Sequence, residues 1–90
     1  MTTRPLTFGG SRLAINYATS AAGGLRVELQ TESGKAIQGF TLADCQEIIG
    51  DELERVVQWK GGADLTPLIG TPIRLRFVLN DADLYSLRFP

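Results

Sequence analysis

With 90 residues and a net charge of −1, the chain is the size of one small domain, and folding a chain of this length buries only about 60–65% of its unfolded surface. The near-neutral charge gives no electrostatic reason to expect nucleic acid or an anionic membrane as a partner, and no apolar run approaches the roughly 18 residues of a spanning helix. The sequence has no histidine, so the usual general base, the commonest zinc ligand and the Ser-His-Asp and Cys-His arrangements are all absent.

The first third of the chain predicts three short strands joined as a meander. Residues 5–8 are predicted to form an edge strand, because Pro5 suits a strand start, and the N-terminus has no apolar stretch typical of a signal peptide. Apolar residues alternate with polar or small ones in residues 12–17 and again in 25–30, which is the period of a strand with one buried face. Residues 19–24, which are small, polar and glycine-ended, are predicted to form the loop between them.

The middle of the chain, residues 36–51, is the least regular part. A turn before it places Gly34 where a positive φ is expected. Thr41 and Asp44 have the spacing of a capping box, which predicts a single helical turn. The lone cysteine, Cys45, excludes an intrachain disulfide and a cysteine metal cluster. We expect it to be a small buried residue, with a reactive thiol as the alternative.

Carboxylates gather in the middle of the chain and at the predicted C-terminal turn: Asp44, Glu47, Asp51, Glu52, Glu54, Asp81 and Asp83. Paired carboxylates serve acid–base enzymes, but a domain of this size has little volume for a pocket. Loop carboxylates also supply the oxygen ligands that Ca²⁺ prefers. The sequence therefore predicts no catalytic residue, no metal site and no cofactor, with a structural calcium ion as the alternative to a solvated acidic loop.

Residues 53–60 are predicted to form a strand that ends with the only tryptophan, Trp59. Trp59, Lys60 and Asp64 flank a glycine pair and are the candidate ligand-binding residues, because sugar-binding proteins stack pyranose rings on exposed aromatic side chains. A lone tryptophan in a strand is more often a core residue, and the sequence leaves both positions open. Asp64 is also a good N-cap for a short helical turn that ends at Gly70.

The C-terminal residues predict a hairpin. Residues 73–80 and 84–89 alternate in hydrophobicity, and residues 80–83 between them are typical of a turn. The alternation places Tyr17 and Tyr85 on inward faces, so we expect both in the core. Charged residues on the other face are predicted to form a ladder that is either solvated or an interface: Arg26, Glu28, Arg74, Arg76 and Arg88.

Taken together, these patterns predict an all-β fold. We expect a single antiparallel β-sandwich, jelly-roll-like, with about six or more strands and one short helical turn. The glycine-rich points do not match a phosphate-binding loop and are predicted to be turns. No repeat or linker divides the chain, so residues 1–90 are predicted to form one domain.

Two long stretches carry a resemblance to a known group of proteins. Residues 54–65 (ERVVQWKGGADL) and 70–89 (GTPIRLRFVLNDADLYSLRF), together with residues 19–23 and the pair Gly39 and Phe40, are similar to a β-sandwich segment at the C-terminal end of certain bacterial proteins. Those proteins resemble glycoside hydrolase family 32 and sialidase-like enzymes, in which a β-propeller precedes the sandwich. Their catalytic carboxylates lie in the propeller, and this sequence shows no propeller motif, so no catalytic residue is carried over.

The resemblance implies a non-catalytic accessory module of a longer carbohydrate-active protein that packs against its catalytic domain. Such a module is expected to expose an apolar patch including Ile48 and Ile49. The alternative is a stand-alone carbohydrate-binding module with an exposed aromatic at Trp59; a small enzyme is disfavoured. The expected partners are a neighbouring catalytic domain or a glycan, with no nucleic acid and no membrane, and a homodimer is left open. An extracellular or periplasmic location follows only if the parent protein is secreted.

Overall fold

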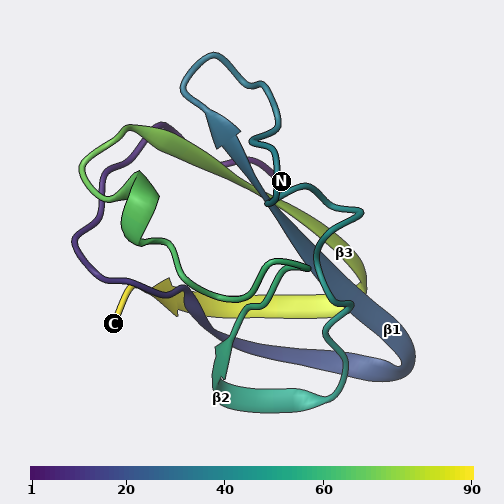
Figure 1. Cartoon of the computed structure of the whole chain (residues 1–90). Helices are drawn as coiled ribbons and strands as arrows, with labels where there is room; N and C mark the ends of the chain where they lie inside the picture. The colour runs from purple at the N-terminus through teal and green to yellow at the C-terminus, as the bar shows by residue number, and fades with distance from the viewer.

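One three-stranded antiparallel sheet, with the strand order β2-β1-β3, organises the chain (Figure 1). The computed structural model describes residues 1–90: β1 is Ala14–Thr31, β2 is Asp51–Val56, and β3 is Ile73–Arg88. The only helical segment is the 3₁₀ turn η1, Thr66–Leu68, at the place where the sequence predicts a short helical turn. None of the helical structure is long and apolar enough to cross a membrane.

The prediction of a jelly-roll sandwich with six or more strands is wrong, because β1 and β3 pair with each other along nearly their whole length. Ala14 lies opposite Arg88 at one end of the ladder, and Thr31 lies opposite Ile73 at the other. Residues 14–17 and 25–30, which come from two predicted strands, therefore belong to the single strand β1. The prediction of a C-terminal hairpin is also wrong: residues 73–80 and 84–88 of its two arms lie within β3 and pair with β1, not with each other.

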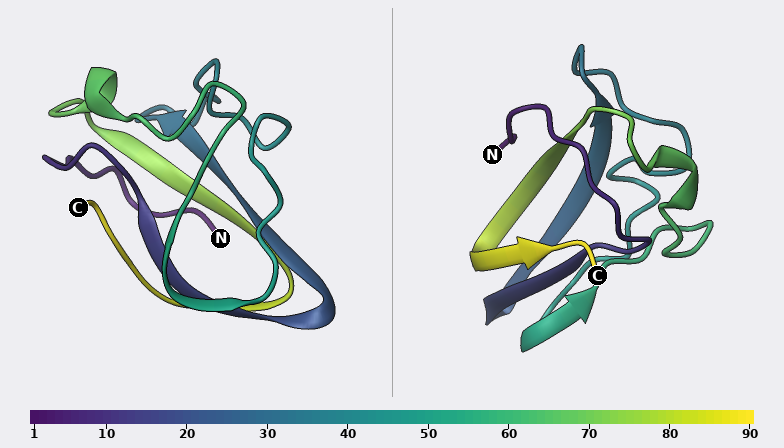
Figure 2. Two further views of the ribbon diagram at one scale, coloured as in Figure 1. Left: turned by 60° about the horizontal axis from the view of Figure 1, so that its bottom comes forward. Right: turned by 90° about the vertical axis from the view of Figure 1, so that its left-hand side faces the viewer.

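Residues 19–24 of β1 and residues 80–83 of β3, which the sequence predicts to be a loop and a turn, instead form a shared corner of the two strands. The register between β1 and β3 shifts between Thr19 and Gly24, and Asp81 on the facing strand has a φ of 48°, a conformation that aspartate tolerates better than most residues. A Cβ atom on Gly23 would lie 2.4 Å from the carbonyl oxygen of Asp81, so only glycine fits there. Both strands thus bend together without separating, and the sheet doubles back on itself (Figures 1 and 2).

The corner divides the sheet into two parts with separate names below. The two-stranded half consists of residues 24–31 of β1 and 73–80 of β3. The three-stranded half consists of residues 14–19 of β1, residues 82–88 of β3, and β2. Six core side chains point inward from the two-stranded half and are each at most 1% exposed: Leu25, Val27, Leu29, Ile73, Leu75 and Phe77.

The N-terminal segment covers one edge of the two-stranded half. The Thr3 amide donates to the Leu75 carbonyl oxygen at 2.9 Å, and Leu6 and Ile73 exchange two backbone hydrogen bonds. The segment therefore pairs with β3, and the predicted meander of residues 5–8 with 12–17 is wrong. At the other end of the chain the ring of Phe8 stacks on that of Phe89, with centroids 4.4 Å apart.

Loops cover the opposite edge of the two-stranded half. Leu25 and Ile48 exchange two backbone hydrogen bonds. At Val27, the next edge position of β1, two side chains take the place of a pairing strand. The Val27 amide donates to Cys45 Sγ at 3.4 Å, and the indole N–H of Trp59 donates to the Val27 carbonyl oxygen at 2.9 Å. Cys45 is 4% exposed, as expected for a small buried residue, and burial raises the pKa of its thiol.

Other local predictions are confirmed. Gly34 has a φ of 93°, and the amide of Cys45 donates to the Thr41 carbonyl oxygen at 3.1 Å, which closes the expected single turn. Glu28 lies opposite Arg76 and forms the one ion pair of the charge ladder, at 3.7 Å. It is not part of a solvated face, however, because it is 7% exposed and accepts hydrogen bonds from the Gln30 side chain and the Leu42 amide. Arg88 is not part of that ladder, because it lies in the three-stranded half and pairs with Glu54.

Candidate functional site

The structure does not present Trp59 as a surface on which a ligand can stack. Its side chain is 2% exposed, and its ring meets that of Phe40 edge-on at 5.3 Å. The sequence leaves open whether Trp59 is a core residue or an exposed platform, and the structure places it in the core. The strand predicted for residues 53–60 ends at Val56, and the chain then leaves the sheet to bury Trp59.

The other two candidate residues, Lys60 and Asp64, are exposed and border no cavity. The Asp64 carboxylate accepts a hydrogen bond from the Thr66 amide at 2.9 Å and one from the Thr66 hydroxyl. These bonds lower the pKa of Asp64. Asp64 is not the N-cap that the sequence predicts, because Leu65 occupies that position; its carboxylate binds the first residue of η1 from one position earlier. The three candidate residues do not converge on one site.

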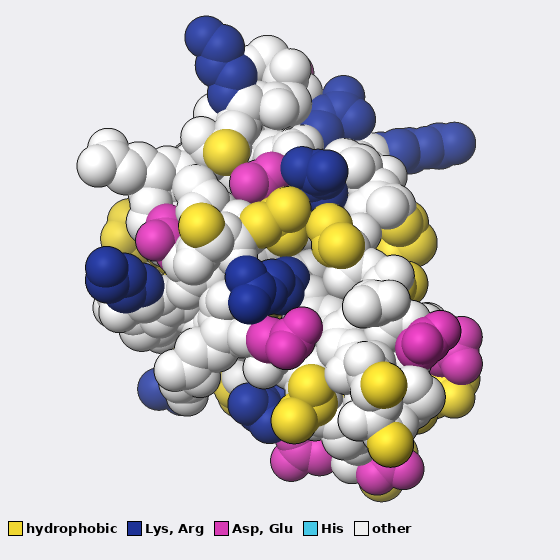
Figure 3. All heavy atoms as spheres, turned by 90° about the vertical axis from the view of Figure 1, so that its right-hand side faces the viewer, with side chains coloured by type: hydrophobic (Ala, Val, Ile, Leu, Met, Phe, Trp, Pro, Cys, Tyr) yellow, Lys and Arg dark blue, Asp and Glu magenta, His cyan; other side chains and the backbone are white.

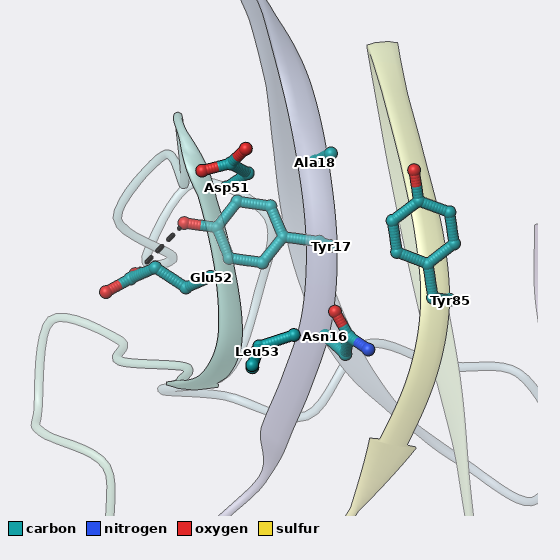
Figure 4. A pocket seen from close by; sticks show the side chains of 7 residues that line it. All are labelled: Asn16, Tyr17, Ala18, Asp51, Glu52, Leu53 and Tyr85. Carbon is teal, nitrogen blue, oxygen red and sulfur yellow. Dashed lines mark hydrogen bonds between the residues drawn. The ribbon is translucent and has the colours of Figure 1, made fainter.

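A shallow hollow of about 410 Å³ lies instead on the outer face of the three-stranded half (Figure 4). Its volume is within the range of small-molecule sites. All three strands contribute to it: Asn16, Tyr17 and Ala18 from β1, Asp51, Glu52 and Leu53 from β2, and Tyr85 from β3.

Local irregularities in the sheet aim the large side chains of this hollow outward. The register of β1 shifts between Ile15 and Tyr17 against β2, and between Asn16 and Tyr17 against β3. Bulges of this kind redirect side chains. Leu53 is consequently 84% exposed and Tyr85 63% exposed, so the expectation of a core position is confirmed for Tyr17 and wrong for Tyr85.

One end of the hollow is held by a hydrogen-bonded group of side chains. The Tyr17 hydroxyl lies 2.8 Å from the Ile49 carbonyl oxygen and 3.1 Å from Glu52 Oε2, and its single proton is shared between these acceptors. The Arg55 guanidinium donates to the same carboxylate at 3.0 Å. This group fastens β2 to β1.

The same contacts set the charges at this end. The hydrogen bond from Arg55, followed by the one from Tyr17, lowers the pKa of Glu52, while burial and then the neighbouring carboxylate raise the pKa of Tyr17. At neutral pH Glu52 is an anion and Tyr17 keeps its proton. A general acid needs the opposite, a carboxyl whose pKa is raised, so Glu52 is not suited to donate a proton.

The remaining polar groups around the hollow are free to bind a solute. Among the polar lining side chains, only Tyr17 and Glu52 are hydrogen-bonded within the chain. The amide of Asn16, the carboxylate of Asp51 and the hydroxyl of Tyr85 therefore have no partner in the protein. The amide offers both donors and an acceptor, whereas the carboxylate offers acceptors alone.

The acidic residues of the middle segment are dispersed, and on the face drawn in Figure 3 the Asp and Glu side chains lie in several separate places. No three His, Cys, Asp or Glu side chains form a group that could hold a metal ion. Thr41 donates to Asp44 at 2.9 Å, and Glu52 and Glu54 each pair with an arginine. The calcium alternative therefore has no ligand cluster in its favour.

Comparison with known proteins adds nothing to this geometry: no protein-family model, no curated protein and no solved structure matches the chain. Sequence reasoning missed the hollow because its aromatic, Tyr85, follows the alternation of an inward face. The sequence does carry one signal, the charged pair Asp51 and Glu52 directly before Leu53. This pair indicates an edge strand, but it does not indicate which side chains lie opposite that strand.

Proposed function

We propose that the chain is a non-catalytic accessory domain of a carbohydrate-active protein, and that it packs against the catalytic domain of that protein through the open edge of β2. The carbohydrate-active context comes from the resemblance of residues 54–65 and 70–89 described above. The docking surface is defined by β2 and the residues just before it, with Ile49 and Leu53 as its apolar side chains. The expectation that Ile48 is exposed beside Ile49 is wrong, because Ile48 is 1% exposed and belongs to the core.

The observation that carries this proposal is the exposure of Leu53 on an edge strand. Leu53 is 84% exposed, Ile49 is 60% exposed, and β2 lies at the edge of the sheet. None of residues 51–56 makes a backbone hydrogen bond beyond the ladder with β1.

The unpaired backbone groups of an open edge are a template for pairing with another chain, and full burial of one leucine side chain contributes about 1.5–3 kcal/mol. A neighbouring domain that covers this edge would satisfy its backbone groups and bury both side chains. In Figure 1 the edge lies at the opposite end of the molecule from the turn around Lys35, which supplies a control position.

Site-specific photo-cross-linking tests the docking. A photoreactive phenylalanine analogue replaces Leu53 in the protein expressed in its own cells, and a second protein carries it at the exposed Lys35. We expect the Leu53 variant alone to form an adduct whose peptides map to a carbohydrate-active catalytic domain. An adduct with a second copy of this chain, adducts with unrelated proteins, or equal yields from both positions would refute the proposal.

Tyr85 favours a second candidate function, carbohydrate binding by the chain itself. An exposed aromatic is what that function needs, and Tyr85 is 63% exposed beside the unpaired amide of Asn16. Trp59, the aromatic named by the sequence, is buried and does not support this function.

A further inference from the structure

The hollow has two apolar walls and a low floor. Leu53 on β2 and Tyr85 on β3 stand on either side of β1, and the floor between them consists of Asn16 and Ala18 (Figure 4). Because Ala18 carries only a methyl group, a flat, ring-shaped molecule has room between the two walls. The C–H bonds of a pyranose face pack well on an aromatic ring, and the tyrosine hydroxyl stays in contact with water.

The polar groups of the hollow suit a ligand rich in hydroxyl groups. A sugar hydroxyl both donates and accepts hydrogen bonds. The Asn16 amide complements both roles, and the Asp51 carboxylate accepts strongly. Neither group has a partner within the chain, so neither must give up a protein contact to bind.

The charge around the hollow disfavours an anionic ligand. Asp51 and Glu52 line it, and Asp83 on β3 lies directly opposite Ala18 on the same face. Arg55, the cation on β2 closest to these groups, is held by Glu52 at 3.0 Å. A carboxylated or sulfated sugar would thus place its charge among like charges, whereas a neutral sugar would not.

We infer that this hollow binds one neutral pyranose ring, stacked on Tyr85 and hydrogen-bonded by Asn16 and Asp51. The inference rests on the second candidate function, and it does not require that β2 docks against another domain. If docking occurs as well, the shared wall at Leu53 places the sugar at the junction of the two domains, where a bound glycan chain can run between them.

Titration of the ¹⁵N-labelled 90-residue chain, followed in ¹H–¹⁵N spectra, tests this inference. The probes are the methyl glycosides of glucose, galactose, mannose and xylose, and the methyl glycoside of glucuronic acid as the anionic counterpart. We expect at least one neutral glycoside to shift the amides of residues 16–18, 51–53 and 85 in a saturable manner, and the glucuronide to bind more weakly than the glucoside.

Three variants give the test its controls. Tyr85→Ala is expected to weaken binding about tenfold or more, by analogy with the loss of one aromatic stacking partner, while Tyr85→Phe keeps the affinity within about twofold because the ring remains. Val78→Ala removes a comparably exposed apolar side chain of β3 from the two-stranded half, and it should leave binding unchanged. Native-like spectra of each variant establish that it is folded.

Several outcomes would overturn the inference. They are the absence of saturable shifts with every neutral glycoside up to its solubility, tighter binding of the glucuronide, shifts centred on Trp59 and Lys60, or unchanged affinity in Tyr85→Ala. These titrations use the chain alone, whereas the cross-linking at Leu53 uses the cellular protein. One proposal can therefore be refuted while the other still holds.

Discussion

The two halves of the bent sheet differ in how completely they are covered. In the two-stranded half, six inward side chains are each at most 1% exposed, and both sheet edges are satisfied by the N-terminal segment and by the loops that carry Cys45 and Trp59. In the three-stranded half, no residue of β2 and none of residues 82–88 is buried, and no backbone hydrogen bond covers its outer edges.

This difference gives the two halves different roles, stability for the two-stranded half and recognition for the three-stranded half. Burial of apolar side chains is the main favourable contribution to folding, so the two-stranded half supplies most of it. The three-stranded half contributes fewer buried groups and leaves Leu53, Tyr85 and the hollow between them exposed to partners. Regions of low local stability are also those from which binding surfaces are commonly drawn.

The largest expected effect comes from a truncation in the covered half. Phe77→Ala should lower the free energy of unfolding by about 3–5 kcal/mol, because Phe77 is 1% exposed and its removal leaves a cavity. Leu87→Ala, in the other half of the same strand, should cost only about 1 kcal/mol. Urea unfolding followed by Trp59 fluorescence measures both. Equal losses of unfolding free energy in the two variants would contradict the difference between the halves. Phe77→Leu is the milder variant to use if the Phe77→Ala protein does not fold.

Trp59→Phe tests the loop that closes the edge of the covered half. The change removes the indole donor and leaves the Val27 carbonyl oxygen without that hydrogen bond, which should cost about 1–3 kcal/mol. Circular dichroism follows the unfolding, because the only tryptophan is lost. Tyr85→Phe, which removes an exposed hydroxyl in the open half, should change stability by less than about 0.5 kcal/mol. A similar cost for the two substitutions would contradict this assignment of roles.

The corner between the halves is tested by Gly23→Ala. Its new Cβ atom would lie 2.4 Å from the Asp81 carbonyl oxygen, so the strands must separate locally, at a cost of about 1–3 kcal/mol. Gly9→Ala is the matched control, since no atom lies within 4 Å of a Cβ there. Thermal unfolding of both variants measures the difference, and a Gly23→Ala protein as stable as Gly9→Ala would show that the two strands do not approach in this way.

The smallest effect is expected at the exposed carboxylate of Glu52, which pairs with Arg55 on β2 and accepts the hydrogen bond of Tyr17 on β1. The pKa of Glu52 is lowered in the folded chain, so its contribution to stability is present above the unfolded value of about 4.3 and is lost as the pH falls through the lower folded value. The melting temperature of Glu52→Gln should therefore fall less than that of the unmodified chain between about pH 6 and pH 3. If the melting temperatures of the two proteins fell equally with pH, that result would argue against the contacts of Glu52 with Arg55 and Tyr17.

Strand segments were predictable from the sequence, but their partners were not. The alternation in residues 25–30 and 73–77 correctly predicts the buried apolar side chains, but it does not predict that Glu28 and Gln30 are buried as well or that Leu79 is 37% exposed. Residues 80–83 have the same turn chemistry whether the chain reverses or merely bends. What decides between these outcomes is the close fit of Gly23 against Asp81, a contact between residues far apart in the chain.

The candidate site was less predictable for a related reason. Period-two alternation assigns Tyr85 to an inward face, and one bulge in the pairing of β3 with Asn16 and Tyr17 is enough to reverse that assignment. Trp59 lies in a loop that covers the core, and its position depends on the free carbonyl group of Val27. Neither feature leaves a local signal in the sequence.

Native-state hydrogen exchange of the backbone amides is the most direct measurement of the difference between the halves. The amides of Arg26, Glu28, Arg76 and Val78 should exchange only through global unfolding, because these residues pair across the ladder between β1 and β3 in the covered half. The amides of β2 and of residues 84–87 should exchange faster, through local opening of the three-stranded half. Uniform protection across the sheet, or slower exchange in the three-stranded half, would contradict the separation of a stabilising half from a binding half.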